Sequence, residues 1–121
     1  MREKIFLFRE LGEDGKYRFH APYDAIHVNK GGSAHGGFVA TMLDMACGFA
    51  VASSSGVPGL VPVATVSLTI NYMAAANNGP FMAEGQVVGG GRRIVTASAT
   101  LYGGTCKAVA VAQAVFRREK V

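Results

Sequence analysis

The feature that most constrains the fold is an alanine- and methionine-rich stretch, from about residue 36 to residue 53, that contains no proline. This composition favours a helix, which we predict over 36–54. Apolar residues lie on all its sides, and such a helix is stable only when other parts of the protein enclose it. The stretch is short for a membrane span and is interrupted by Asp44. We therefore expect a buried helix in a soluble protein.

After this helix, the hydrophobic period changes to two. Apolar residues alternate with threonine, serine and asparagine from Ala64 to Tyr72, which is typical of a strand. We predict strands at about 63–74, 81–88, 92–102 and 105–116, separated by glycine-rich turns. Before the helix, 4–8 is expected to be a short strand or a helical turn, 9–16 a turn, and 17–28 extended. The predicted fold is a single α+β domain over 1–121, with a curved antiparallel β-sheet wrapped around one long central helix.

The charge of the chain favours a small anionic ligand. The formal net charge is +4 and the pI is near 9.3. The arginines occur as the pairs Arg92-Arg93 and Arg117-Arg118, and no basic run is dense enough for a nucleic-acid arm. A phosphorylated small molecule therefore fits this pattern better than a nucleic acid, and we expect no nucleic-acid partner.

The cysteines and the first residues bear on the cellular compartment. Cys47 and Cys106 lie in apolar surroundings without metal-ligand spacing, so we expect two buried, reduced thiols and no metal site. The first fifteen residues carry charges too early and too often for a signal peptide. A cytoplasmic protein without a membrane anchor is the expectation.

Asp44 is the only formally charged residue between Lys30 and Glu84. An isolated carboxylate among apolar residues costs several kcal/mol unless it is paired or hydrogen-bonded. The neighbours on its side of the helix are all small, which leaves room for a substrate or an opposing chain; they are Ala40, Thr41, Cys47 and Gly48. A solvent-facing stripe or a buried hydrogen-bond network are the structural alternatives for Asp44.

A second group of residues precedes the helix and has the pattern Asn29-x-x-Gly32-x-x-His35-Gly36-Gly37. The start of a helix offers backbone N–H groups and a positive dipole, which suit a developing oxyanion. The amide of Asn29 could hold a water molecule or a carbonyl group. The structural alternative is a loop followed by a helix with His35 near its cap.

Together these residues resemble the PaaI-type branch of the hotdog-fold acyl-CoA thioesterases. The resemblance rests on Asn29, on His35-Gly36-Gly37, on the acid nine residues after the histidine, and on the strand opening Val63-Ala64-Thr65-Val66. It extends over residues 24–116. Later segments agree with it, namely Ile70-Asn71-Tyr72-Met73, Asn78-Gly79, Gly91-Arg92 and Ala110-Val111-Ala112-Gln113.

The resemblance implies a role for each residue of the site. Asp44 would be the nucleophile or the general base, and the N–H of Gly36 would polarise the thioester carbonyl. Asn29 would orient water or the thioester, and Thr65 would hold the water or the carboxylate. His35 could contact the thioester but is more typical of a capping group. Family members are homodimers, usually paired into homotetramers, with Asn29 and Gly36 from one subunit and Asp44 and Thr65 from its partner.

CoA would enter as part of the substrate, and no separate cofactor is expected. Arg92 and Arg93 follow a glycine turn ending at Gly91, where guanidinium and N–H groups could bind the CoA phosphates. The alternative for these arginines is a solvated hairpin end. The acyl group could lie against residues that would equally form an ordinary core, namely Met42, Met45, Phe49 and Met73.

Two other functions are compatible with this fold. A non-catalytic hotdog module could bind acyl-CoA, although it has no need of an acid in the middle of the helix. A hotdog hydratase or dehydratase usually has its catalytic histidine before a proline-glycine helix start, whereas this chain has His35-Gly36-Gly37. The sequence leaves open the acyl group, CoA or acyl-carrier protein as the carrier, and dimer or tetramer.

Overall fold

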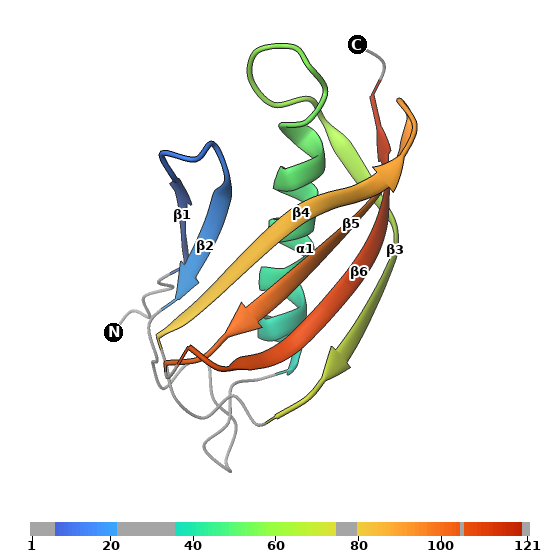
Figure 1. The fold of residues 1–121 in the computed structure, drawn as a ribbon. Helices are drawn as coiled ribbons and strands as arrows, with labels where there is room; N and C mark the ends of the chain where they lie inside the picture. Colours follow the sequence, from blue (N-terminus) through green and yellow to red (C-terminus); the bar gives the residue numbers. More distant parts are fainter. Residues whose placement is uncertain (1–6, 22–35, 75–79, 105, 120–121) are drawn as a thin grey trace, which may run out of the picture.

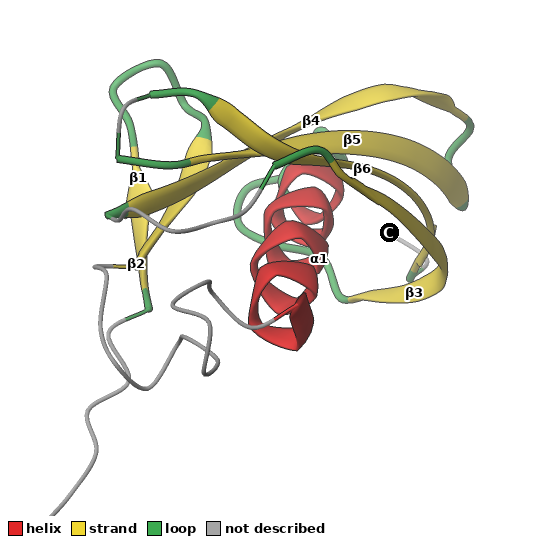
Figure 2. Cartoon of the chain, turned by 90° about the horizontal axis from the view of Figure 1, so that it is seen from below, coloured by secondary structure: helices red, strands yellow, loops and turns green. Residues whose placement is uncertain are grey.

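The computed structural model describes residues 7–21, 36–74, 80–104 and 106–119 of the 121-residue chain. In these ranges one helix packs on one face of a six-stranded antiparallel sheet whose strand order is β1-β2-β4-β5-β6-β3 (Figures 1 and 2). The elements are β1 (Phe8–Leu11), β2 (Tyr17–Ala21), α1 (Gly36–Ala52), β3 (Val63–Tyr72), β4 (Phe81–Gly90), β5 (Ile94–Tyr102) and β6 (Ala108–Arg118). The predicted α+β arrangement, a curved sheet around a long helix, is confirmed.

The element boundaries differ from the predicted ones in a few places. The prediction of a turn over 9–16 is wrong for residues 9–11, which belong to β1. All four residues of β1 are exposed, so the strand lacks the apolar alternation that would have revealed it. The helix ends at Ala52, two residues before its predicted end. β6 ends at Arg118, two residues after the predicted end of the last strand. Residues 22–28 of the predicted extended segment lie outside the described residues.

Small residues allow the helix to lie very close to the sheet. Ala97 and Ala99 in β5, and Ala110, Ala112 and Ala114 in β6, are buried on the inner face of the sheet, beneath α1. Gly85 in β4 makes the closest approach, because a Cβ added there would lie 2.7 Å from the carbonyl carbon of Ala46. The alanine face of β6 therefore receives the helix.

The opposite face of α1 is not covered by the described residues of this chain. Gly36, Gly37 and Thr41 are exposed, and Asp44, Met45 and Phe49 are half-buried. Figure 2 shows that this side of the helix points away from the sheet. The described residues of one chain therefore do not provide the predicted enclosure of the helix on nearly every side. Within the described ranges, the length and hydropathy needed to cross a membrane are not reached by any helix.

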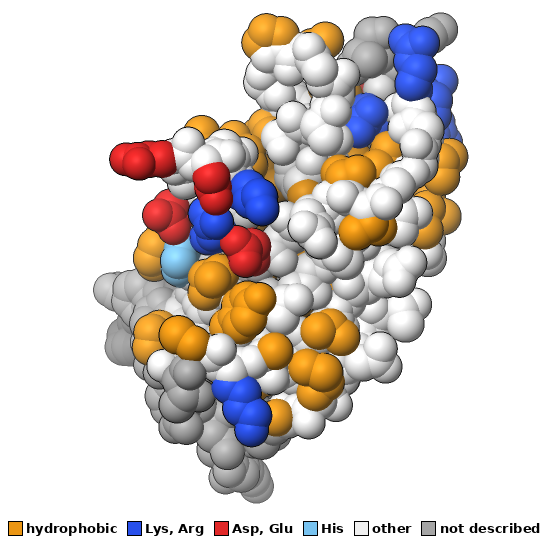
Figure 3. All heavy atoms as spheres, viewed as in Figure 1, with side chains coloured by type: hydrophobic (Ala, Val, Ile, Leu, Met, Phe, Trp, Pro, Cys, Tyr) orange, Lys and Arg blue, Asp and Glu red, His pale blue; other side chains and the backbone are white. Residues whose placement is uncertain are grey.

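The two edges of the sheet have different character. At one edge, Arg18 of β2 binds Asp14 and Glu84, each at 2.8 Å, and so ties the β1–β2 hairpin to β4. Hydrogen bonding from Arg18 lowers the pKa of Asp14 to about 2. The other edge is β3, in which seven of ten residues are exposed. Figure 3 shows charged side chains gathered over the hairpin and few over the middle of the sheet.

Candidate functional site

Asp44 lies in the middle of α1 and is hydrogen-bonded to β3. The hydroxyl of Thr65 donates to Oδ1 of Asp44 at 3.0 Å. The Asp44 side chain is half-buried, so it is neither in bulk water nor enclosed in the core. A donor that binds a carboxylate restrains its rotamer. The structure thus brings together two of the predicted site residues.

A β-bulge directs Thr65 toward the helix. In β3, Leu68, Ile70 and Tyr72 pair with inner-face alanines of β6, and Ser67 pairs with Val115 on the outer face. Strict alternation would place Thr65 on the outer face with Ser67, because side chains two residues apart share a face. A register shift between Thr65 and Ser67 instead pairs Thr65 with the buried Phe116. A bulge that re-aims one side chain is common next to functional sites.

A pocket of about 410 Å³ begins at Asp44 and runs along the C-terminal half of α1. It is mostly apolar and is lined by Asp44, Met45, Gly48, Phe49, Ala52, Leu60, Val61, Pro62, Val63, Thr65 and Phe116. We call it the Asp44 pocket. Met45 and Phe49 were predicted as candidates for an acyl pocket and do line it. Met42 is fully buried in the core, which was the alternative for these residues, and Met73 is 53% exposed and does not line the pocket.

The start of α1 is held by the far end of β3. The Tyr72 hydroxyl donates to the carbonyl oxygen of Gly36 at 3.0 Å. Gly36 precedes Asp44 by eight residues, which corresponds to about 12 Å along a helix. Within one chain, the Gly36 N–H and the Asp44 carboxylate are therefore too far apart to act on one carbonyl group. Asn29 and His35, the other predicted residues of this region, lie outside the described residues.

The cysteines differ from each other. Cys47 is completely buried, and burial, with a smaller contribution from the Asp44 charge, raises the pKa of its thiol to about 12. A thiol that stays protonated near neutral pH is a poor nucleophile. Cys106 is exposed, in a turn with a φ of 64°, so the prediction that both cysteines are buried is wrong for Cys106.

The arginines predicted to bind phosphate lie in the turn before the start of β5, beside the end of β6. Arg92 and Arg93 are exposed; Arg93 Nε donates to the carbonyl of Arg118 at 3.1 Å, and the N–H of Gly91 donates to Ile94 within the turn. Arg118 itself is buried. Its guanidinium donates to the carbonyls of Arg92 and Val51 and, at 2.6 Å, to Ser54 Oγ. Arg118 therefore donates a hydrogen bond to a backbone carbonyl in the last turn of α1, where a cation also interacts favourably with the helix dipole.

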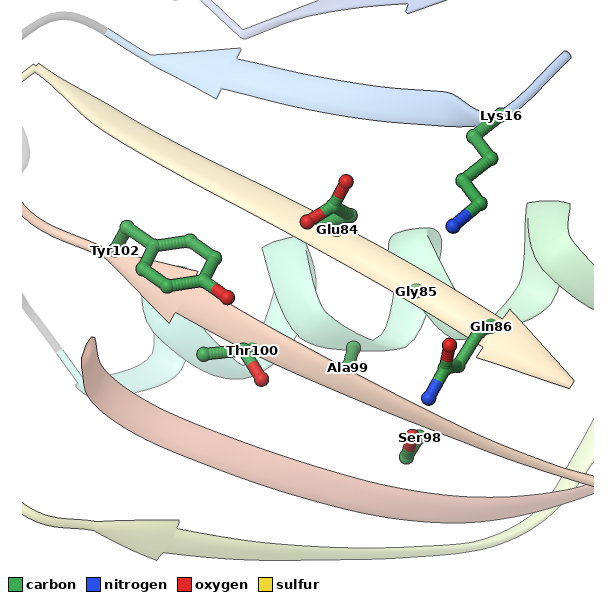
Figure 4. Close-up of a pocket in the computed structure, with 8 residues that line it drawn as sticks. All are labelled: Lys16, Glu84, Gly85, Gln86, Ser98, Ala99, Thr100 and Tyr102. Atoms are coloured by element: carbon green, nitrogen blue, oxygen red, sulfur yellow. The ribbon is translucent and has the colours of Figure 1, made fainter. Parts of the chain in front are cut away.

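A smaller cavity, of about 140 Å³, lies on the other face of the sheet. Polar side chains of β4 and β5 project into it, and α1 lies behind these strands (Figure 4). The carboxylate that lines it, Glu84, is bound by Arg18 at 2.8 Å. In the described parts of the chain, three or more potential metal ligands do not cluster anywhere. The Asp44 pocket is the stronger candidate for chemistry because it joins an apolar cavity to an oriented carboxylate.

Comparison with known proteins identifies relatives of this chain. The family model described as "Thioesterase superfamily" matches residues 31–110, which is 80 of 121 residues. A presumed esterase of Pseudomonas aeruginosa is 37% identical over 94 residues, covering 77% of this chain and 68% of the relative. A presumed esterase of Halobacterium salinarum is 38% identical over 82 residues, covering 65% of this chain. The match spans only 54% of the Halobacterium protein's length.

A structural relative agrees with the fold. A Bacillus halodurans protein crystallised with CoA superposes with a TM-score of 0.81 at 24% identity, covering 94% of this chain and 74% of that protein. At this identity the likeness concerns the fold alone. The family match, in contrast, includes Gly36, Asp44 and Thr65. This chain belongs to the thioesterase superfamily and has the hotdog fold.

Proposed function

We propose that this protein hydrolyses acyl-CoA thioesters to a free acid and CoA, with Asp44 as nucleophile or general base. The observation that carries the proposal is the Asp44 carboxylate, held by Thr65 at 3.0 Å, at the polar end of a mostly apolar pocket. This arrangement accommodates an apolar acyl group and presents a carboxylate beside it. The names of the family and of the relatives support hydrolysis of an ester or thioester.

The chemistry needs one base or nucleophile and one group that polarises the carbonyl. As a base, Asp44 removes a proton from water while the water oxygen attacks the carbonyl carbon. The C–S bond then breaks and the CoA thiolate takes up the proton. As a nucleophile, Asp44 attacks the same carbon, and the C–S bond breaks to give a mixed anhydride and the CoA thiolate. Water then hydrolyses the anhydride to the free acid and the Asp44 carboxylate, and the proton released goes to the thiolate. Thr65 serves either route because it orients the carboxylate.

The carbonyl would be polarised by the Gly36 N–H of a second copy of the chain. The separation of about 12 Å along α1 prevents Gly36 and Asp44 of one chain from sharing a substrate. An open sheet edge is a natural site for pairing with another chain, and β3 is such an edge. We therefore propose a homodimer, with Asn29 and Gly36 from one chain and Asp44 and Thr65 from the other.

The proposed dimers would pair again into a homotetramer through the outer face of the sheet. Neither β3 nor β5 contains a formally charged residue. Solvent-facing surfaces usually carry many charges, so this face is suited to contact with another subunit. The free thiols of Cys47 and Cys106 fit the proposed cytoplasmic location, where thiols stay reduced.

The substrate class follows from the lining of the Asp44 pocket. Beyond Asp44 and Thr65, all its lining residues are apolar or glycine, so the acyl group would be uncharged, either aromatic or aliphatic. CoA is proposed as the carrier because the related Bacillus halodurans protein was crystallised with it. The exposed Arg92 and Arg93 are proposed to bind its phosphates.

The direct test measures free thiol released from a panel of aromatic and aliphatic acyl-CoAs. Asp44→Asn should lower kcat by about 10²–10⁴-fold, the usual contribution of a general base. Asp14→Asn, in the exposed turn before β2, is the matched control and should keep wild-type turnover. Binding of acyl-CoA without thiol release would favour the binding module, and a change in enoyl-thioester absorbance without release would favour a hydratase.

A second test addresses the shared site. Gly36→Pro removes the N–H at the first helical position, where proline is tolerated. Gly36→Ala keeps the N–H, and its Cβ would meet nothing closer than 3.7 Å. Mixing the impaired Asp44→Asn and Gly36→Pro chains, after unfolding and refolding together, should raise turnover well above that of either variant alone, because one intact site forms in each mixed dimer. No recovery would contradict a site shared between chains.

A further inference from the structure

The residue pair Tyr72 and Gly36 connects the end of β3 to the first residue of α1. The hydroxyl donates to the Gly36 carbonyl at 3.0 Å, across 36 residues of sequence. The ring also lies against the glycine, because ring atoms are 3.9 and 4.0 Å from the position of an added Cβ. Tyr72 is 56% exposed, so this contact is not a by-product of core packing.

The contact acts on a backbone position that would otherwise be loosely held. Glycine has the largest conformational freedom of all residues, and the first residues of a helix lack helical partners for their N–H groups. A hydrogen bond to the Gly36 carbonyl restrains the peptide plane that follows its Cα, and with it the ψ angle that relates this plane to the Gly36 nitrogen. It thereby restrains the direction of the Gly36 N–H.

We propose that Tyr72 is a positioning residue, which acts through the Gly36 carbonyl to orient the N–H that polarises the thioester. This inference rests on the proposed function. It also gives β3 two tasks in the same chain. Thr65 near the start of the strand holds the carboxylate, and Tyr72 at its end holds the carbonyl-polarising amide.

The measurable consequence is a loss of turnover with little loss of binding. Tyr72→Phe removes the hydroxyl and keeps the ring. Since a neutral hydrogen bond makes a small net contribution, kcat should fall about 2- to 10-fold while KM changes less than about twofold. Tyr102→Phe, on the outer face of β5, is the matched control and should have wild-type kinetics.

A double-mutant cycle identifies the group through which Tyr72 acts. In a Gly36→Pro background the N–H is gone, so adding Tyr72→Phe should cause no further fall in kcat. In a Thr65→Val background, where the N–H remains, the full 2- to 10-fold fall should reappear. For each variant, light scattering measures the oligomeric state and urea unfolding measures the stability.

Three outcomes would overturn the inference. The first is wild-type kcat for Tyr72→Phe; the second is an equal fall in kcat in the Gly36→Pro background. The third is a fall that accompanies dissociation of the oligomer, which would assign Tyr72 to assembly. If the wild type is active and depends on Asp44, these outcomes leave the proposed function intact. A wild type that releases no thiol from any acyl-CoA would overturn both.

Discussion

Gly85→Ala is the substitution whose effect can best be worked out from the structure. The added Cβ would lie 2.7 Å from the carbonyl carbon of Ala46 and 3.1 Å from the nitrogen of Cys47. Ordinary contact begins near 3.4 Å, so α1 and β4 would have to separate by at least 0.7 Å (3.4 − 2.7). The opposing atoms are helix backbone and cannot rotate away. We expect the upper part of the usual overpacking cost, about 2–3 kcal/mol.

The assay is urea unfolding, together with turnover. At a typical slope of about 2 kcal/mol per molar urea, the midpoint should fall by about 1 M or more. The separation of α1 from β4 also moves Asp44, which lies on this helix. Its hydrogen bond to Thr65 is 3.0 Å long and is lost when the two oxygen atoms move apart by more than a few tenths of an ångström. Turnover should therefore fall as well.

Gly89→Ala is the control for this prediction. Gly89 lies in the same strand, and a Cβ there would meet nothing within 4 Å. Alanine also reduces the freedom of the unfolded chain, so this variant should be as stable as the wild type or slightly more stable. Equal stability of the two variants would refute the claim that the close approach at Gly85 sets the distance between helix and sheet.

Four further predictions concern the site and its surroundings. Thr65→Val should lower kcat about 5- to 30-fold, through loss of a charge-assisted hydrogen bond, whereas Thr69→Val on the outer face of β3 should not. Leu60→Ala, at the far end of the Asp44 pocket, should raise KM for long acyl groups more than for short ones. A thiol reagent at pH 8 should modify Cys106 in the native protein and Cys47 only after unfolding. Burial raises the pKa of Cys47 from 9.0 to about 12, so between these pH values the folded state keeps a proton that the unfolded state loses. The free energy of unfolding should therefore fall as the pH rises from 9 to 12. In the Cys47→Ala variant this fall should be smaller.

The main elements of the fold could be predicted because two signals are strong. The proline-free apolar stretch became α1, and the period-two alternation became the long strands β3 to β6. β1 was missed because its four residues are all exposed and include Arg9 and Glu10. The bulge after Thr65 was also missed, since alternation alone assigns each residue to a face and cannot show where the register shifts.

The candidate site could be predicted where a single residue stands out from its sequence surroundings. Asp44 was identified as the lone charge in an apolar segment. The resemblance predicted that Thr65 holds the water or the carboxylate, and in the structure the Thr65 hydroxyl is bonded to the carboxylate. The contact between Tyr72 and Gly36 had no signal in the sequence, because tyrosine also fits the alternation of the strand. The sequence also had no signal for the hydrogen bonds of Arg118 at the end of α1 or for the bond from Arg93 to the carbonyl of Arg118. A pair of arginines has the same appearance whether it binds a ligand or a backbone carbonyl.

The spacing on α1 also determines how two copies would have to meet. In a dimer with twofold symmetry, each contact occurs twice. Asp44 of each chain can meet Gly36 of the other only if the two helices run antiparallel, with the axis near residue 40, midway between them. That part of the helix contains Ala40 and Thr41, and the Thr41 hydroxyl is already bonded to the carbonyl of Gly37 at 2.9 Å. Small side chains without unmet hydrogen bonds permit close helix packing, so bulky residues at position 40 or 41 should abolish both sites at once.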